Sequence, residues 1–195
     1  MSATAADYHK RLSDFMVENV FPAEASYHAY REEQGPKDHT VPPVVEELKI
    51  EARKRGLWNL FLPSESGLTN LEYAPLCEIM GRVGFAPEVF NCSAPDTGNM
   101  EVLVRYGTAE QQKQWLTPLA QGEMLGAFCL TEPHVGSDAS ALRTTAVKEG
   151  DAYVINGVKQ FITSGKNGQV AIVIAMTDKA AGKKGMSAFL VPTDA

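Results

Sequence analysis

The stretch Phe128-Cys129-Leu130-Thr131-Glu132-Pro133-His134-Val135-Gly136-Ser137-Asp138 marks the point where the chain changes character. Its apolar start, Phe128 to Leu130, predicts a short buried strand, and Pro133 ends that strand because proline has no N–H group for a strand ladder. The residues that follow are therefore expected to form a loop. Gly136 and Ser137 offer backbone donors with little side-chain bulk, and Thr131 offers a hydroxyl, which together suit the polar edge or phosphate of a ligand. Loops of this composition also serve as plain structural connections.

The residues before this stretch predict an antiparallel helical domain. Apolar residues recur at helical spacing along residues 5–20, again after the prolines at 42–43, and in three later segments. Two pairs, Thr69 with Glu72 and Thr108 with Gln111, have the spacing of helix capping boxes. Residues 88–106 are expected to form an irregular helix, because proline and glycine interrupt them. About five helices in roughly 120 residues are typical of an antiparallel helical domain.

The residues after this helical part predict strands, because the hydrophobic period falls from about four to about two near Gly122–Gly126. We place a domain boundary there, between residues 124 and 125. Asn156-Gly157 is the strongest hairpin signal, since a type I′ turn needs positive φ at both central residues, and Glu149-Gly150-Asp151 predicts a second turn. Two apolar runs, Val170–Met176 and Met186–Val191, predict further strands.

The fold class that follows is α+β. A helical domain, residues 1–124, precedes an antiparallel β domain, residues 125–195, which is expected to be a meander or an incomplete barrel. Because strand signals continue up to Ala195, we expect an unpaired sheet edge, and the chain looks cut short.

Composition narrows the class of protein. The chain has 195 residues, of which 44% are hydrophobic and 22% charged, enough to bury a core. Its net charge of -6 argues against a nucleic-acid-binding surface, which needs concentrated positive charge. Three widely spaced cysteines do not suggest a disulfide framework, and the sequence shows neither a signal peptide nor an apolar run of about 20 residues.

Several common chemistries are disfavoured by the absence of their motifs. No G-x-G-x-x-G follows a predicted strand and no P-loop sequence occurs, so a Rossmann or P-loop nucleotide enzyme is not indicated. The four histidines are scattered without metal-ligand spacing. Ser137 lies in a suggestive loop, but no histidine is placed to act as its base.

Two motifs, taken in order, resemble the acyl-CoA dehydrogenase family. The run Leu130-Thr131-Glu132-Pro133-x-x-Gly136-Ser137-Asp138 is similar to the family signature. The run Val154-Ile155-Asn156-Gly157-x-Lys159-x-Phe161-Ile162-Thr163 is similar to its second flavin-contacting segment. Segments of the helical part also fit the family, so the resemblance covers nearly the whole chain. The run from Asn91 to Met100 is similar to a subgroup of larger members, some of them fused to a phosphotransferase-like unit.

The resemblance implies a flavoprotein oxidoreductase that removes the α-proton of an acyl-CoA thioester and transfers a β-hydride to FAD, as in the β-oxidation of fatty acids. The implied cofactor-binding residues are Phe128, Leu130, Thr131, Gly136, Ser137, Phe161, Ile162 and Thr163. The Thr131 hydroxyl would bond the polar edge of the flavin, Phe161 would cover the far face of its ring, and Thr163 would donate toward its reactive nitrogen. The implied substrate residues are Ser137, close to a phosphate or the thioester arm, and Ala94 and Thr97 in the acyl pocket.

The sequence departs from the family pattern at three positions. Phe161 replaces the usual tryptophan, which keeps an aromatic face and loses the indole donor. His134 and Val135 stand where the family has small or acidic residues, and β-branched Val135 would resist a positive φ.

The resemblance implies no catalytic base in this chain, because the family's base lies in a carboxy-terminal helical bundle that is absent here. Glu132 is expected to be a salt-bridged structural carboxylate instead. We therefore expect the 195-residue chain alone to be inactive.

The resemblance also implies partners. These are an acyl-CoA substrate, an electron-transfer flavoprotein or other acceptor, and further copies in a homodimer or homotetramer of the complete enzyme. From charge, motif spacing and the length of the apolar runs we expect no nucleic acid, metal or membrane span. The implied location is soluble and intracellular: cytoplasmic in a bacterium, mitochondrial or peroxisomal in a eukaryote. Two alternatives stay open, namely a non-catalytic acyl-CoA- or flavin-binding module and a flavin oxidase or monooxygenase of the same fold.

Overall fold

The chain folds into two compact units. The computed structural model describes residues 1–194, so Ala195, the last residue of the predicted β domain, lies outside the described part. One unit comprises Met1–Thr97 and the other begins at Gly98. The predicted order of helices followed by strands is confirmed, because helices extend to Ala120 and the first strand begins at Gly126. In this division the helices after Thr97 belong to the same compact unit as the strands. The domain boundary between residues 124 and 125 stays a prediction.

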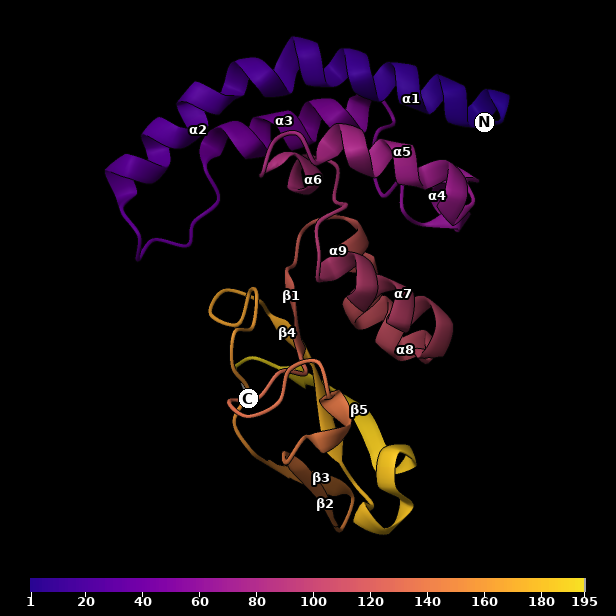
Figure 1. Cartoon of the computed structure of the whole chain (residues 1–195), viewed down its shortest axis with the longest axis vertical. Helices are drawn as coiled ribbons and strands as arrows, with labels where there is room; N and C mark the ends of the chain where they lie inside the picture. Colours follow the sequence, from indigo (N-terminus) through magenta and orange to yellow (C-terminus); the bar gives the residue numbers. More distant parts are fainter. Residues whose placement is uncertain (195) are drawn as a thin grey trace. The chain divides into compact units, whose positions relative to one another are not determined.

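A long helix begins the first unit. Helix α1 (Ala3–Phe15), a π-helical turn (Met16–Val20) and α2 (Phe21–Gln34) follow one another without a break (Figure 1). The helix thus continues past Pro22, which lies in the first turn of α2, where a missing N–H is tolerated. The π-helical turn directly before it is the local adjustment that inserts an extra residue into the helical ladder. The predicted apolar stripe is confirmed, because its members Leu12, Phe15, Met16 and Val20 are buried. Ala5 and Ala23 are buried beside them.

Shorter helices complete the first unit: α3 (Pro43–Lys54), α4 (Pro63–Ser66), α5 (Asn70–Met80) and α6 (Ala86–Val89). The Thr69–Glu72 capping box at the start of α5 is confirmed, with the side chains bonded reciprocally to the backbone. In the core, the fully buried rings of Phe15 and Phe90 meet edge to face with their centroids 5.3 Å apart. The interruption predicted at Pro95 is confirmed, since no helix is present between Val89 and Asp96. The interruption predicted at Gly98 is wrong, because Gly98 lies inside α7.

The second unit combines helices with a sheet. Helix α7 (Asp96–Tyr106) starts at the unit boundary and is followed by α8 (Ala109–Gln111), a π-helical turn (Gln112–Leu116) and α9 (Thr117–Ala120). The second predicted capping box, Thr108 with Gln111, is confirmed at the start of α8. Five strands follow: β1 (Gly126–Cys129), β2 (Thr145–Glu149), β3 (Ala152–Asn156), β4 (Val170–Met176) and β5 (Met186–Pro192).

The sheet is mixed where the sequence predicts an antiparallel one. Strand β4 is its centre and pairs antiparallel with β5 along its whole length. On its other side β4 pairs parallel with β1, from Gly126 opposite Val170 to Cys129 opposite Val173. A parallel pair needs a long crossover, and here the crossover contains the β2–β3 hairpin, whose β2 in turn meets β4 at Thr145. Within the described residues the sheet stays open, with β3 pairing to β2 alone and β5 to β4 alone.

The predicted hairpin at Asn156-Gly157 is wrong, whereas the turn at Glu149-Gly150-Asp151 joins β2 to β3 as predicted. Gly150 has the positive φ, 62°, that this turn requires. Residues 157–163 form no strand. Gly157 is instead a close-approach glycine, because a Cβ there would lie 2.2 Å from the hydroxyl oxygen of Thr144.

No helix among residues 1–194 combines the length and apolarity that crossing a membrane requires. Over the same residues, no group of three or more His, Cys, Asp or Glu side chains is placed to hold a metal ion. Cys77, Cys92 and Cys129 are free thiols.

The close approach at Gly157 predicts the effect of an added methyl group. Gly157→Ala is expected to lower the free energy of unfolding by about 1–3 kcal/mol, because the Cβ would overlap three atoms of Thr144 within 2.7 Å. Gly136→Ala is the matched control, since no heavy atom lies within 4 Å of its added Cβ. Urea denaturation followed by circular dichroism measures both, and equal stabilities of the two variants would contradict the close packing.

Candidate functional site

The two sequence motifs meet in the second unit. The backbone N–H of Gln160 donates to the carbonyl oxygen of Thr131 at 2.9 Å. The Lys159 ammonium donates to the carbonyl oxygen of Leu130 at 3.0 Å. The segment after Asn156 therefore lies against the end of β1 and its following residues, instead of turning back along β3 as a hairpin would.

The carboxylate of Glu132 is the centre of this junction. Its side chain is 2% exposed, and its Oε1 accepts hydrogen bonds from the Thr144 N–H at 2.9 Å, the Thr144 hydroxyl at 2.5 Å and the Lys159 ammonium at 2.9 Å. Its Oε2 accepts from the Arg143 N–H at 2.7 Å. The interpretation of Glu132 as a salt-bridged loop carboxylate is thus confirmed. Neither Thr144 nor Lys159 is recognisable as a partner of Glu132 from its position in the sequence, although Lys159 lies inside the second motif.

These donors keep Glu132 ionised despite its burial. Burial is the largest single influence and acts to raise the pKa of the carboxyl group. The hydrogen bonds from Thr144, the Arg143 N–H and Lys159 together outweigh burial and lower the pKa from 4.5 to about 2. A carboxylate of this pKa, with both oxygens bonded, is a poor proton acceptor near neutral pH.

A tight turn follows Glu132. The backbone groups of Glu132 and Val135 bond each other in both directions, at 3.0 and 3.1 Å, around Pro133 and His134. Val135 is buried and its φ is not positive, so the strain expected of a β-branched residue at this position is not found. His134 places its Nε2 3.5 Å from Oε2 of Glu132. The turn therefore fixes the direction in which the chain continues to Gly136 and Ser137, both of which are exposed.

Phe161 combines two unusual properties. Phe161 is a large aromatic residue, yet it is 85% exposed. Its φ is 58°, a left-handed conformation that costs a non-glycine residue roughly 1–2 kcal/mol. Strained backbone of this kind clusters at ligand sites, where the surrounding structure holds it in place. Ile162 is half-buried and Thr163 is exposed beside it.

The polar groups of these segments fit the edge of a flavin. Within residues 1–194, the hydroxyls of Thr131, Ser137 and Thr163 bond to no other group of the chain, and neither do the backbone N–H groups of the same three residues. Hydrogen-bond donors together with an exposed aromatic ring match a planar cofactor that has an apolar ring face and a polar rim. The donor set therefore suits a flavin.

The remaining predicted residues belong to two separate parts of the sequence. Phe128 is in β1 and Leu130 directly follows it, and both are half-buried. Ala94 precedes Pro95, and Thr97 is in the first turn of α7, so both belong to the first compact unit. The acyl-pocket role of Ala94 and Thr97 stays a prediction.

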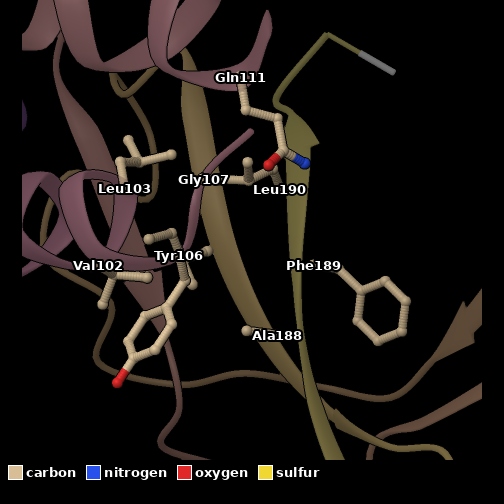
Figure 2. Close-up of a pocket in the computed structure, with 9 residues that line it drawn as sticks. Val102, Leu103, Tyr106, Gly107, Gln111, Ala188, Phe189 and Leu190 are labelled. Atoms are coloured by element: carbon tan, nitrogen blue, oxygen red, sulfur yellow. The ribbon is translucent and has the colours of Figure 1, made fainter. Parts of the chain in front are cut away.

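A small cavity of about 120 Å³ lies elsewhere in the second unit, between helices α7 and α8 and strands β4 and β5. Figure 2 shows its lining residues, with the ring of Phe189 directed away from α7. That ring packs against Tyr153, with the centroids 5.1 Å apart. No residue of the predicted flavin or substrate set lines this cavity. The candidate site is therefore the open junction of the two motifs and not this cavity.

Family models match nearly the whole chain in two parts. Residues 3–123 match the acyl-CoA dehydrogenase N-terminal domain, and residues 127–195 match the acyl-CoA dehydrogenase middle domain. The chain belongs to the acyl-CoA dehydrogenase family. The resemblance drawn from the two motifs is thus confirmed.

Curated relatives agree with this membership. A Mycobacterium tuberculosis protein named probable acyl-CoA dehydrogenase FadE2 is 53% identical over all of this chain and 49% of its own length. Acyl-CoA dehydrogenase family member 11 of Gallus gallus is 46% identical over 94% of this chain but 25% of its own length. The chain thus spans about half of the first relative and a quarter of the second, which is consistent with the resemblance to larger family members.

Solved structures share the fold. A Mycobacterium abscessus structure described as a candidate acyl-CoA dehydrogenase has a TM-score of 0.92 at 46% identity, covering 99% of this chain and 51% of the other. A glutaryl-CoA dehydrogenase from Mycobacterium smegmatis, solved in complex with FADH2, has a TM-score of 0.75 at 30% identity, covering 100% of this chain and 46% of the other. The α+β fold class is therefore confirmed.

The lowered pKa of Glu132 predicts an acid-dependent loss of stability. The folded-state pKa of about 2 lies below the unfolded value of 4.5, so the stabilisation is complete above pH 4.5 and is lost as the pH falls toward 2. Between pH 4.5 and pH 2 the free energy of unfolding of the wild type is expected to fall by about 3 kcal/mol more than that of Glu132→Gln. Urea denaturation at pH 6, 4 and 2.5 measures the difference.

Glu149→Gln is the matched control, because Glu149 is an exposed carboxylate at the end of β2. It should keep the pH dependence of the wild type. A Glu132→Gln variant that loses stability in acid as steeply as this control would contradict the assignment of Glu132 as the acid-sensitive centre.

Proposed function

We propose that this chain is part of an FAD-dependent acyl-CoA dehydrogenase, which converts an acyl-CoA thioester into its α,β-unsaturated product. The observation that carries the proposal is the junction of the two motifs, where Lys159 and Gln160 bond three successive residues, Leu130 to Glu132. The junction brings the unpaired donors of Thr131 into the same neighbourhood as exposed Phe161. Bound FAD would supply the acceptor for the hydride that leaves the β-carbon.

Each predicted residue has a role that suits its chemistry. We propose that Thr131 donates to the polar edge of the flavin and that Thr163 donates toward its reactive nitrogen. Phe161 is proposed to cover one face of the ring, which an exposed aromatic can do without an indole donor. The remaining cofactor residues, Phe128, Leu130, Gly136, Ser137 and Ile162, are proposed to shape the ring and phosphate contacts. Support for FAD comes from the related glutaryl-CoA dehydrogenase, whose solved complex contains FADH2.

The partners are proposed by the same family relation. Ser137 is assigned to the thioester arm of an acyl-CoA substrate, and Ala94 and Thr97 to its acyl chain. Electrons would pass from the flavin to an electron-transfer flavoprotein or another acceptor. We propose that the complete enzyme takes part in the oxidation of fatty acyl groups. We also propose that it is a homodimer or a homotetramer.

Titration with FAD tests the proposed flavin role of Phe161. The wild-type chain is expected to quench FAD fluorescence saturably, and Phe161→Ala is expected to raise the Kd about tenfold, because one stacked aromatic face contributes roughly 1–1.5 kcal/mol. Tyr106→Ala is the matched control, since Tyr106 is also a highly exposed aromatic but lies outside both motifs. If Phe161→Ala and Tyr106→Ala bind FAD equally well, the proposed role of Phe161 fails.

The state of Glu132 predicts that the chain alone does not turn over. Removal of an α-proton needs a carboxylate that accepts a proton near neutral pH, and Glu132 is held ionised by four hydrogen bonds with a pKa of about 2. The base is therefore proposed to lie outside the signature loop. Dye reduction by the purified 195-residue chain with FAD and butyryl-CoA or palmitoyl-CoA should stay at background. Dye reduction above background that Glu132→Gln abolishes would assign the base to Glu132 instead.

A further inference from the structure

We propose that Lys159 is a positioning residue that aims the backbone N–H of Thr131 at the flavin site. The inference rests on the proposed function, because it assigns the target of that N–H group. Lys159 lies inside the second motif, but the motif alone does not indicate a role for it.

Lys159 reaches its position through two acceptors on one short segment. The ammonium lies 3.0 Å from the carbonyl oxygen of Leu130 and 2.9 Å from Oε1 of Glu132, and the side chain is 11% exposed. A lysine this buried needs a carboxylate partner, since an unpaired charge in such a place is costly. Glu132 therefore fixes where the ammonium lies, and the ammonium in turn fixes the Leu130 carbonyl group.

The planarity of the peptide bond transmits this effect to Thr131. The Leu130 carbonyl and the Thr131 N–H belong to one trans peptide unit, so the two groups point in opposite directions. Because Lys159 holds the carbonyl oxygen, the Thr131 N–H points away from Lys159. Within residues 1–194 this N–H donates to no other group of the chain, and the next carbonyl, that of Thr131, is occupied by the Gln160 N–H. The Thr131 N–H is thus held in a fixed direction and is available to a ligand.

The charge of Lys159 also strengthens this donor. A cation at hydrogen-bond distance from a carbonyl oxygen polarises the peptide unit, and bonds in such a chain reinforce one another in a low-dielectric environment. The Thr131 N–H is therefore a better donor to an acceptor atom of a flavin than an ordinary exposed amide would be. A neutral side chain at position 159 would lose both the orientation and the polarisation.

Lys159 is needed to orient the Thr131 N–H but not for the chain to fold. Without Lys159, Glu132 would still accept hydrogen bonds from the Arg143 N–H and from the N–H and hydroxyl of Thr144. The carboxylate would keep three of its four donors, so Lys159→Met is expected to remain folded. The matched control is Lys148→Met, the same substitution at an exposed position of β2.

Two measurements on the full 195-residue chain test the inference. In ¹H–¹⁵N spectra without FAD, Lys159→Met should shift the Thr131 amide resonance while the rest of the spectrum stays dispersed. Lys159→Arg should shift it less, and Lys148→Met should leave it in place. In FAD titrations, Lys159→Met should raise the Kd about tenfold, the loss of one hydrogen bond of this kind, with Lys159→Arg in between and Lys148→Met unchanged.

The results also separate this inference from the proposed function. A Thr131 resonance that moves no more in Lys159→Met than in Lys148→Met would overturn the positioning role, as would an unchanged Kd for FAD in Lys159→Met. If the wild-type chain binds no FAD while the Thr131 resonance responds to Lys159, Lys159 orients the amide but the assignment of a flavin as its target is overturned, together with the proposed cofactor role of the junction.

Discussion

The hydrogen-bonded carboxylate of Glu132 is the interaction on which the candidate site depends. Its two oxygens accept from Arg143, Thr144 and Lys159, which come from the segment before β2 and from the segment after β3. A buried carboxylate without these donors would cost several kcal/mol or take up a proton. The carboxylate therefore joins the end of β1 to two segments that are distant in sequence, and the loop from Thr131 to Ser137 takes its shape from that junction.

The same junction explains why Gly157 and Lys159 are needed where they are. Gly157 allows the chain to pass against Thr144, which donates twice to Glu132. Two residues later Lys159 reaches Glu132 and the Leu130 carbonyl, and Gln160 then bonds the Thr131 carbonyl. Phe161 follows directly in a left-handed conformation, with its ring exposed. The strain at Phe161 thus occurs next to the hydrogen-bonded junction of Glu132, Lys159 and Gln160, which can hold it in place.

Patterns among residues close in sequence predicted most of the helices and strands. The apolar stripe of residues 5–20, both capping boxes, the turn at Gly150 and the two apolar strands at the end of the chain are each set by neighbours in sequence, and all are present. The error at Asn156-Gly157 has a physical cause. Asn-Gly favours a type I′ turn locally, but Gly157 is required for contact with Thr144, a tertiary constraint that no local pattern reveals. The parallel pairing of β1 with β4 was missed for the same reason, because pairing across a long crossover depends on the whole sheet.

The two motifs of the site could be predicted from the sequence, but the hydrogen-bond network that joins them could not. Glu132 was correctly interpreted as a salt-bridged carboxylate, yet its partner Lys159 could not be chosen from sequence, since any of the chain's cations could have filled that role. The most direct test of the account is a double-mutant cycle on Glu132→Gln and Lys159→Met, measured as free energies of unfolding in urea. The account predicts a coupling energy above about 1 kcal/mol, as expected for a buried charged pair in one network. Free energies that add within about 0.3 kcal/mol would contradict it.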